Sequence, residues 1–199
     1  LSQLNIKHYR FVDDNFILSP HFVDICEGMI SFNISYRCHS RSDLLTSSKA
    51  RWLKASGCQE GAINVESADD KVLTLNNKKE IAADHIKAVK ILKDNDIKVK
   101  MYFVMGLPGE TDQTLKLNKE FVAETKPDKW TISTFTPYPG CDIYRNPDKY
   151  DIKITDYNWD NWWNFCQGKY NHIINGQTPE EMWTRYEDFY AFMKGESWK

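Results

Sequence analysis

The chain has 199 residues, which suits one domain or one domain with a short appendage. Apolar residues make up 41% and charged residues 27%, as in an ordinary soluble globular protein. A net charge of −2 offers no basic surface to nucleic acid or anionic membranes, and no apolar run approaches the roughly 20 residues that span a bilayer. We therefore expect a cytoplasmic protein that binds neither nucleic acid nor membrane.

Five cysteines are scattered along the chain, and none stands in a C-x-x-C or tighter cluster. The sequence thus signals neither a disulfide scaffold nor a local metal site, and we expect reduced thiols. The first residue, Leu1, is not a methionine, and residues 1–6 are predicted to be the end of a helix. We expect a chain that was processed or expressed as a separate domain.

The first 140 residues repeat one pattern, in which an apolar strand is followed by a polar loop and an amphipathic helix. Strands are predicted at residues 9–12, 32–36, 62–65, 99–105 and 130–135. Helices are predicted from Ser19-Pro20 onward, from about Asp43 to Gly57, near residues 79–95 and from Thr111 onward. The first helix is predicted to bury a stripe made by Phe22, Ile25, Cys26 and Met29.

Five strands that alternate with helices predict an α/β protein with one parallel sheet in sequential order and right-handed crossovers. The connections are short and the units repeat without a change of pattern, which favours a partial (β/α) barrel over a doubly wound sheet. In either architecture the ligand site lies at the carboxyl ends of the strands.

The pattern changes after Gly140. One predicted helix face, which is either core or a stacking platform for a flat substrate, holds Trp159, Trp162, Trp163, Cys166 and Tyr170. A last helix is predicted to begin at Thr178-Pro179, and its buried stripe holds Met182, Tyr186, Phe189 and Met193. We predict a barrel portion over residues 1–143 and a C-terminal helical appendage over residues 144–199.

Polar side chains follow the first two predicted strands. Asp13-Asp14-Asn15 ends the first strand, and adjacent carboxylates there can bind an ammonium group or a hard cation. The alternative is that aspartate only caps the next turn. Arg37 and Arg41 follow the second strand, and arginine is a natural bidentate partner for a carboxylate, with a surface ion pair as the alternative.

The later strands also end in polar or turn-forming residues. Glu66 directly follows the apolar third strand, where a charged group needs a partner, either a ligand ribose or amine or a neighbouring lysine. The run GLPGET begins at Gly106, and glycine lets the backbone approach a ligand without a Cβ in the way. The rigid turn PYPG begins at Pro137 and either lines a pocket or only ends the fifth strand.

Taken in order, these motifs resemble the radical S-adenosylmethionine (SAM) enzymes, in the branch that commonly carries a cobalamin-binding domain. Within it the sequence resembles the anaerobic magnesium-protoporphyrin IX monomethyl ester cyclases. The resemblance covers residues 1–150 and rests on FVDDNF from Phe11, Arg41-x-Asp43, ASGC from Ala55, VES from Val65, Asn77-Lys78, FVMGLPGET from Phe103, FTPYPG from Phe135, and Ile143-Tyr144.

The resemblance implies a partial (β/α)₆ barrel that holds SAM against a [4Fe–4S] cluster, with cobalamin bound by a missing N-terminal domain. The small-molecule substrate is not implied. Carried over position by position, the SAM contacts are Asp13 and Asp14 for the amino group, Arg41 for the carboxylate, Glu66 and Ser67 for the ribose, and Gly106 and Pro137 for the adenine.

Two departures from the family pattern limit what we expect of this chain. The cluster motif C-x-x-x-C-x-x-C is absent and is expected upstream of Leu1, and Val65 stands where a glycine usually precedes the Glu-Ser pair. Without three thiolates there is no cluster, and without a cluster SAM is not reductively cleaved. We expect an inactive fragment of an oxidoreductase or methyltransferase.

Two alternatives stay open. The chain could be a non-catalytic barrel module that binds SAM or another nucleotide. It could instead be an unrelated barrel hydrolase, with Asp13, Asp14 and Glu66 around a divalent ion.

Overall fold

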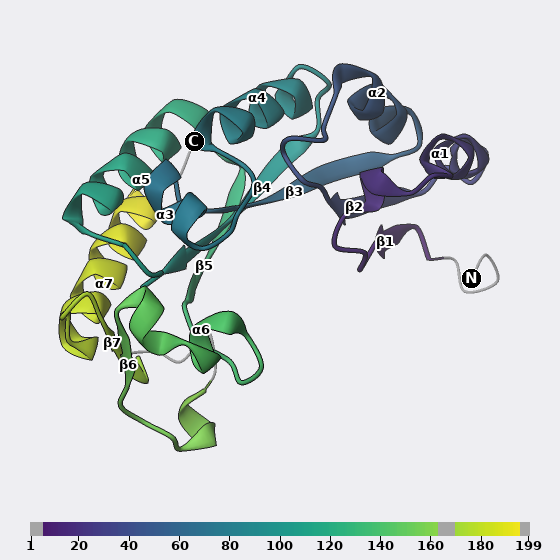
Figure 1. Ribbon diagram of the computed structural model, residues 1–199. Helices are drawn as coiled ribbons and strands as arrows, with labels where there is room; N and C mark the ends of the chain where they lie inside the picture. The colour runs from purple at the N-terminus through teal and green to yellow at the C-terminus, as the bar shows by residue number, and fades with distance from the viewer. Residues whose placement is uncertain (1–5, 163–169, 196–199) are drawn as a thin grey trace. The chain divides into compact units, whose positions relative to one another are not determined.

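The structure is a computed structural model that describes residues 6–162 and 170–195 (Figure 1). Up to Thr134 its elements are β1 His8–Arg10, the 3₁₀ helix η2 Phe16–Leu18, α1 Phe22–Ile30, β2 Ser35–His39, α2 Ser47–Ala55, β3 Cys58–Glu66, α3 Asp70–Leu75, α4 Ala82–Lys93, β4 Lys98–Met105, α5 Asp112–Thr125 and β5 Lys129–Thr134. They are followed by α6 Asp142–Arg145, η3 Pro147–Tyr150, β6 Ile152–Ile154, η4 Trp159–Asn161, β7 His172–Ile174 and α7 Pro179–Gly195.

The first five strands form one parallel sheet in the sequential order β1-β2-β3-β4-β5, as the sequence predicted. In its first ladders Tyr9 lies opposite Tyr36, and Cys38 lies opposite Gly61. The register shifts between Tyr36 and Arg37, which marks a bulge in the second ladder. The fold is part of a parallel (β/α) barrel, and the strands end at the loops that carry the predicted SAM contacts.

The chain divides into two compact units. The first contains Leu1–Val65, Ala83–Tyr102 and Thr125–Thr131, and the second contains Glu66–Ala82, Phe103–Glu124 and Ile132–Lys199. Each has its own core. That of the first holds the fully buried Cys38, Leu53, Ile63 and Leu92, and that of the second holds Phe103, Ile174, Met182 and Phe189. The predicted boundary between residues 143 and 144 stays a prediction.

Several ends of elements differ from the predicted ones for local reasons. α2 begins after Thr46, whose hydroxyl accepts a hydrogen bond from the Lys49 amide at 3.2 Å, rather than near Asp43. It ends before Gly57, as predicted. Gly57 has φ +103, and a Cβ there would lie 2.1 Å from the Ile34 carbonyl oxygen.

The predicted start of the second strand and the predicted buried face of the first helix were wrong. β2 begins three residues later than predicted, because Asn33 turns the chain at φ 45 and Phe32 is 65% exposed. In α1 only Phe22 and Cys26 of the predicted buried stripe are buried, and Ile25 is 37% exposed. The six-residue helix α3 was not predicted at all.

The C-terminal helix α7 begins as predicted. Thr178 and Glu181 form a reciprocal capping box, in which the Thr178 amide donates to the Glu181 carboxylate at 2.8 Å and the Glu181 amide donates to the Thr178 hydroxyl at 3.3 Å. The segment before it contains an antiparallel pair, β6 and β7, that the sequence did not predict. Trp159 stands in the short helix η4. The predicted positions of Trp163 and Cys166 lie outside the described residues.

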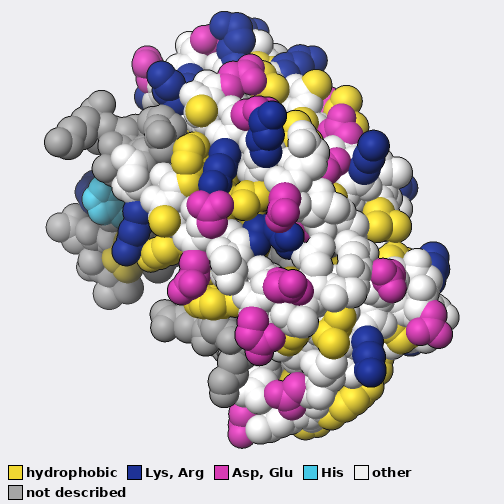
Figure 2. All heavy atoms as spheres, turned by 90° about the vertical axis from the view of Figure 1, so that its left-hand side faces the viewer, with side chains coloured by type: hydrophobic (Ala, Val, Ile, Leu, Met, Phe, Trp, Pro, Cys, Tyr) yellow, Lys and Arg dark blue, Asp and Glu magenta, His cyan; other side chains and the backbone are white. Residues whose placement is uncertain are grey.

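Acidic and basic residues nearly balance in the sequence, which has a net charge of −2. On the face drawn in Figure 2, acidic and basic side chains are interspersed with small groups of hydrophobic ones. Across residues 6–162 and 170–195, every helix is too short or too polar to cross a bilayer.

Candidate cofactor-binding site

In the first unit, the loop after β1 contains two aspartates, of which Asp13 caps a turn and Asp14 is exposed. The Asp13 carboxylate accepts a hydrogen bond from the Asn15 amide at 2.7 Å, which is the turn-capping role. Asn15 in turn accepts the Arg41 amide through its side-chain oxygen at 3.3 Å, so the loops after β1 and β2 are joined. The exposed Asp14 carboxylate has no hydrogen-bond partner among the described residues.

Asp14 borders a half-buried polar surface on β2. Burial lowers the pKa of His39, the Arg10 cation lowers it further, and Asn64 and Asp14 oppose the shift. The His39 ring stacks on Tyr102 with 5.4 Å between ring centroids. The lowered pKa favours the neutral imidazole of His39, so this side chain supplies no cation to pair with the Asp14 carboxylate.

Arg41 is already engaged by a near neighbour. Its Nε and one terminal nitrogen donate to the two carboxylate oxygens of Asp43 at 3.0 and 2.8 Å. This bidentate pair lowers the pKa of Asp43. A ligand carboxylate at Arg41 would have to share or replace this partner.

In the second unit, Glu66 at the end of β3 is paired with a lysine. Its backbone adopts φ 60, and its Oε1 lies 3.5 Å from Nζ of Lys78. Burial raises the pKa of Glu66, and Lys78 opposes this shift. Lys78 also lies 3.4 Å from the Glu80 carboxylate. Of the two partners considered from the sequence, the neighbouring lysine is the one observed.

Ser67 is buried and helps to begin α3. Its hydroxyl accepts the Asp69 amide at 3.2 Å, and the Asp69 side chain accepts the Thr114 hydroxyl of α5 at 2.8 Å. The side-chain oxygen of Asn118, also in α5, accepts the Ala68 amide at 2.7 Å. The loop after β3 is therefore fixed to α5 by buried hydrogen bonds.

Gly106 adopts φ +83 at the end of β4 and is closely packed by its own chain. A Cβ at this position would lie 2.4 Å from the Tyr170 ring, so internal packing already requires glycine here. The ligand approach predicted from the sequence stays a prediction. The neighbouring β5 loop is joined through the Phe135 amide, which donates to the Met105 carbonyl at 2.8 Å. Pro137, two residues later, is buried.

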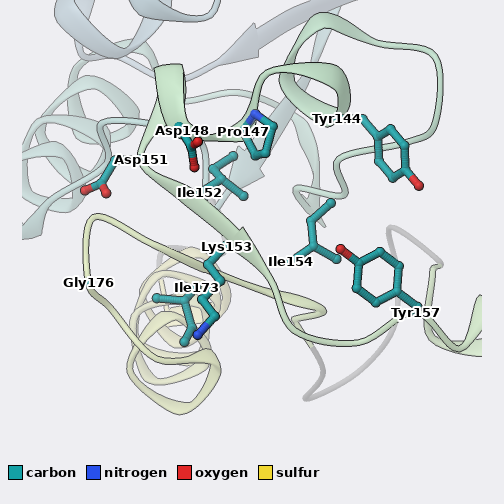
Figure 3. A pocket seen from close by; sticks show the side chains of 10 residues that line it. All are labelled: Tyr144, Pro147, Asp148, Asp151, Ile152, Lys153, Ile154, Tyr157, Ile173 and Gly176. Atoms are coloured by element: carbon teal, nitrogen blue, oxygen red, sulfur yellow. The ribbon is translucent and has the colours of Figure 1, made fainter.

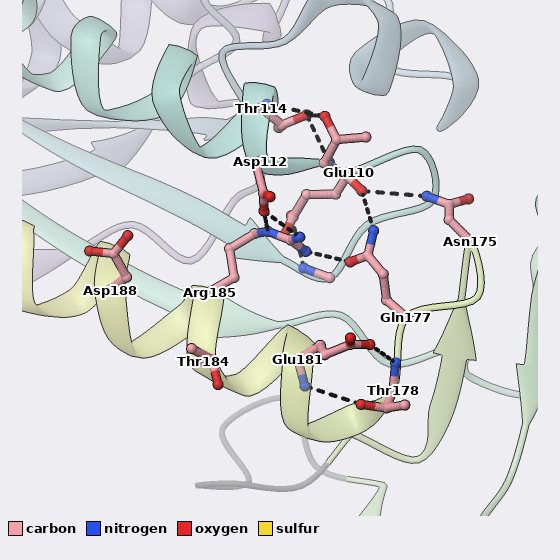
Figure 4. A network of polar contacts seen from close by, with 12 residues as sticks. Glu110, Asp112, Thr114, Asn175, Gln177, Thr178, Glu181, Thr184, Arg185 and Asp188 are labelled. Atoms are coloured by element: carbon pink, nitrogen blue, oxygen red, sulfur yellow. Dashed lines mark hydrogen bonds and ion pairs between the residues drawn. The ribbon is translucent and has the colours of Figure 1, made fainter.

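Sequence reasoning missed the groups that fix the Gly106 turn. The Glu110 carboxylate accepts the Gly106 amide at 2.9 Å, and Arg185 of α7 lies 3.8 Å from its other oxygen (Figure 4). The Tyr170 hydroxyl donates to the Met105 carbonyl at 3.1 Å. Glu110 could have been found from the sequence because it belongs to the GLPGET motif, whereas Arg185 belongs to no motif.

A separate cavity of about 690 Å³ lies around η3, β6 and β7. Figure 3 shows Tyr144 and Tyr157 at one end of it and Asp148 and Asp151 at the other. Its volume suits a small molecule. None of the seven predicted SAM contacts lines it.

The four cysteines that the structure describes do not fit an iron–sulfur cluster. Two of them, Cys38 and Cys58, have their sulfurs 3.9 Å apart on neighbouring strands, although they are scattered in the sequence. Cys26, Cys38 and Cys58 are fully buried. The hydrogen bond with Cys58 and burial raise the pKa of Cys38, and burial raises the pKa of Cys26. Metal ligation needs thiolates, and among the described residues no three His, Cys, Asp or Glu side chains could hold a metal.

Five parallel strands that alternate with helices define an α/β protein with part of a parallel barrel. The sequence profile of the Radical SAM superfamily matches residues 2–122, more than half of the chain. The chain belongs to the radical SAM superfamily, which implies SAM and a [4Fe–4S] cluster.

Named relatives point to the same family. An uncharacterized methyltransferase of Pyrococcus horikoshii is 26% identical over 94% of this chain and 42% of its own length. The anaerobic magnesium-protoporphyrin IX monomethyl ester cyclase of Rubrivivax gelatinosus is 25% identical over 81% of this chain and 28% of its own length. The chain thus spans less than half of these curated relatives.

A solved structure shares the fold. It is the radical SAM methyltransferase TsrM from Kitasatospora setae with cobalamin and a [4Fe–4S] cluster bound. It has a TM-score of 0.73 and 13% identity, and the match covers 96% of this chain and 44% of that one.

Proposed function

We propose that this chain is the SAM-holding part of a radical SAM oxidoreductase or methyltransferase, whose cluster ligands come from outside these 199 residues. The match to the superfamily over residues 2–122 carries the proposal. The relatives named as a methyltransferase and a cyclase support the two reaction classes. In this family the cluster supplies the electron that cleaves SAM, and cobalamin, where used, would be bound by a further domain.

The residues of this chain would bind and orient SAM. Asp14 would contact the amino group, since its carboxylate is exposed and without a hydrogen-bond partner among the described residues. Asp13 and Arg41 would act mainly by shaping that loop. Glu66 and Ser67 would border the ribose, and Gly106 and Pro137 would form the adenine side. The substrate is a small molecule of unidentified class.

Anaerobic reconstitution with iron and sulfide tests this proposal. The 199-residue chain should give no [4Fe–4S] spectrum, because burial raises the pKa of Cys26, hydrogen bonding and burial raise that of Cys38, and no three potential ligands converge among the described residues. The same chain extended by the upstream segment of its gene should gain the cluster and cleave SAM. A stable cluster in the chain alone would contradict the proposal, and its loss in Cys38→Ser or Cys58→Ser would identify ligands within this chain.

A non-catalytic SAM-binding module is the second candidate. The misfit of the described cysteines to a cluster favours it. An extended chain that binds SAM but no iron would support this module over the enzyme.

A further inference from the structure

We propose that Arg185 in α7 is a positioning residue for the Gly106 turn, which it holds in place through the Glu110 carboxylate. The inference rests on the proposed function, in which this turn forms the adenine side of the SAM site. All the residues concerned belong to the second compact unit.

The buried Glu110 side chain fixes the Gly106 turn by accepting a backbone hydrogen bond. Its side chain is 2% exposed, and its Oε2 accepts the Gly106 amide at 2.9 Å. The Leu107 amide is a second backbone donor to the same carboxylate. Oε1 has no hydrogen-bond partner among the described residues and faces the Arg185 guanidinium at 3.8 Å. A buried carboxylate of this kind is costly unless a cation compensates it.

Arg185 is itself held in place and is not a mobile surface cation. It is 9% exposed, and its nitrogens donate to Asp112 of α5 at 2.7 and 3.2 Å. Arg185 also donates to the Gln177 side chain, whose amide nitrogen donates to the Glu110 carbonyl at 3.2 Å (Figure 4). Arg185 therefore contacts the carboxylate of Glu110, and Gln177 contacts its backbone carbonyl.

The ion pair between Arg185 and Glu110 exists only while the Glu110 carboxylate is charged, and burial works against that charge. Burial raises the pKa of Glu110 to about 7, and the backbone amides and Arg185 oppose this rise. Tyr170 and His172, which also face the turn, stay neutral near that pH. Burial raises the pKa of Tyr170 and lowers that of His172 to about 4. Asp112 is already paired with Arg185.

Amide hydrogen exchange of Gly106 and Leu107 against pH tests the proposal in the whole 199-residue chain. After correction for intrinsic exchange, protection should increase as the pH falls through about 7, because the closed turn binds a proton that Glu110 in an opened turn would release. Arg185→Gln should move this midpoint upward and reduce protection about tenfold, the loss of one charge-assisted contact. Arg185→Lys should partly restore both. Glu110→Gln should abolish the pH dependence.

Asp188→Asn is the matched control, since Asp188 forms an exposed ion pair with Lys119 that also joins α7 to α5, at 2.8 Å. It should leave the midpoint where it is. If Arg185→Gln and Asp188→Asn lower protection equally, or if the midpoint stays fixed in Arg185→Gln and Arg185→Lys, Arg185 is only structural and the proposal is overturned.

A SAM titration of the same variants separates this inference from the proposed function. Arg185→Gln should weaken SAM binding about tenfold if the turn forms the adenine side. Unchanged affinity despite a shifted midpoint would overturn the positioning role. Failure of the unaltered chain and of its upstream-extended form to bind SAM would overturn the proposed function, while the exchange midpoints would still decide whether Arg185 holds the turn.

Discussion

The loop after β1 and the turn after β4, which we propose contact the same ligand, differ in how they are held. Asp14 is exposed and unpartnered among the described residues, in a loop held by two hydrogen bonds through Asn15. Gly106 is enclosed by Tyr170 and tied to the buried Glu110. The first loop therefore leaves a carboxylate accessible, whereas the second turn is fixed by buried groups behind its backbone.

The largest effect is expected at Gly106. Gly106→Ala places a Cβ 2.4 Å from the Tyr170 ring at φ +83, so overpacking and left-handed strain should together lower the free energy of unfolding by about 3 kcal/mol or more. Urea denaturation measures this. Gly28→Ala is the control, because no atom lies within 4 Å of its Cβ position in α1 and alanine should stabilise that helix by about 0.5–1 kcal/mol. Equal effects at both sites would show that the turn is not closely packed.

Glu110→Gln should change how stability depends on pH. The pKa of Glu110 is raised to about 7 from 4.5, so the folded chain binds the extra proton between these values and gains stability as the pH falls. The advantage of the unaltered chain over Glu110→Gln should grow by roughly 1.4 kcal/mol per pH unit from pH 7 to about 4.5. Urea denaturation at several pH values checks this, and a constant difference would mean that Glu110 does not titrate there.

Glu110→Gln should also expose an opposite contribution from His172. Burial lowers the pKa of His172 to about 4 from 6.5, so the unfolded chain binds the extra proton and stability is lost as the pH falls. In the Glu110→Gln variant this loss should be visible below pH 6.5. Adding His172→Asn should remove it; persistence of the loss in the double variant would assign it to other groups.

Asp13→Ala should have a modest effect. It removes the acceptor for the Asn15 amide at 2.7 Å in an exposed turn, which should cost about 1 kcal/mol of stability. The neighbouring change Asp14→Asn removes no hydrogen bond among the described residues and should stay within about 0.5 kcal/mol. Thermal unfolding compares them, and a larger loss for Asp14→Asn would mean that Asp14 is structural.

The smallest effect is expected at Arg41. Its pair with Asp43 is bidentate but partly exposed, so Arg41→Ala should lower stability by less than about 1 kcal/mol, and 0.5 M salt should reduce the difference further. Chemical denaturation with and without salt measures both. A loss of several kcal/mol would show that Arg41 anchors the loop.

The order of the sheet and the capping of α7 could be predicted, because apolar runs and the Thr178 capping box are local signals. The contact of Arg185 with Glu110 could not, since it joins residues 75 positions apart and arginine carries no motif of its own. The approach of Cys38 to Cys58 depends on the register of β2 and β3, which includes a shift that no pattern revealed. The exposure of Ile25 likewise depends on where α1 packs.

Seven site residues came from motif order, and the structure gives several of them local roles. Asp13 caps a turn, Arg41 pairs with Asp43, and Ser67 begins α3. These roles fix the loops in which a ligand would be held. They were not readable in the sequence because each depends on the conformation of a loop and not on its composition.

Amide chemical shifts during a SAM titration of the 199-residue chain test whether the loops after β1, β3 and β4 bind SAM. The shifted resonances should be those of Asp14, Glu66 and Gly106 with their neighbours, and Asp14→Asn should weaken binding without changing stability. Shifts confined to the cavity lined by Tyr144 and Tyr157 would contradict this binding site, as would shifts that leave the Gly106 turn untouched at saturating SAM.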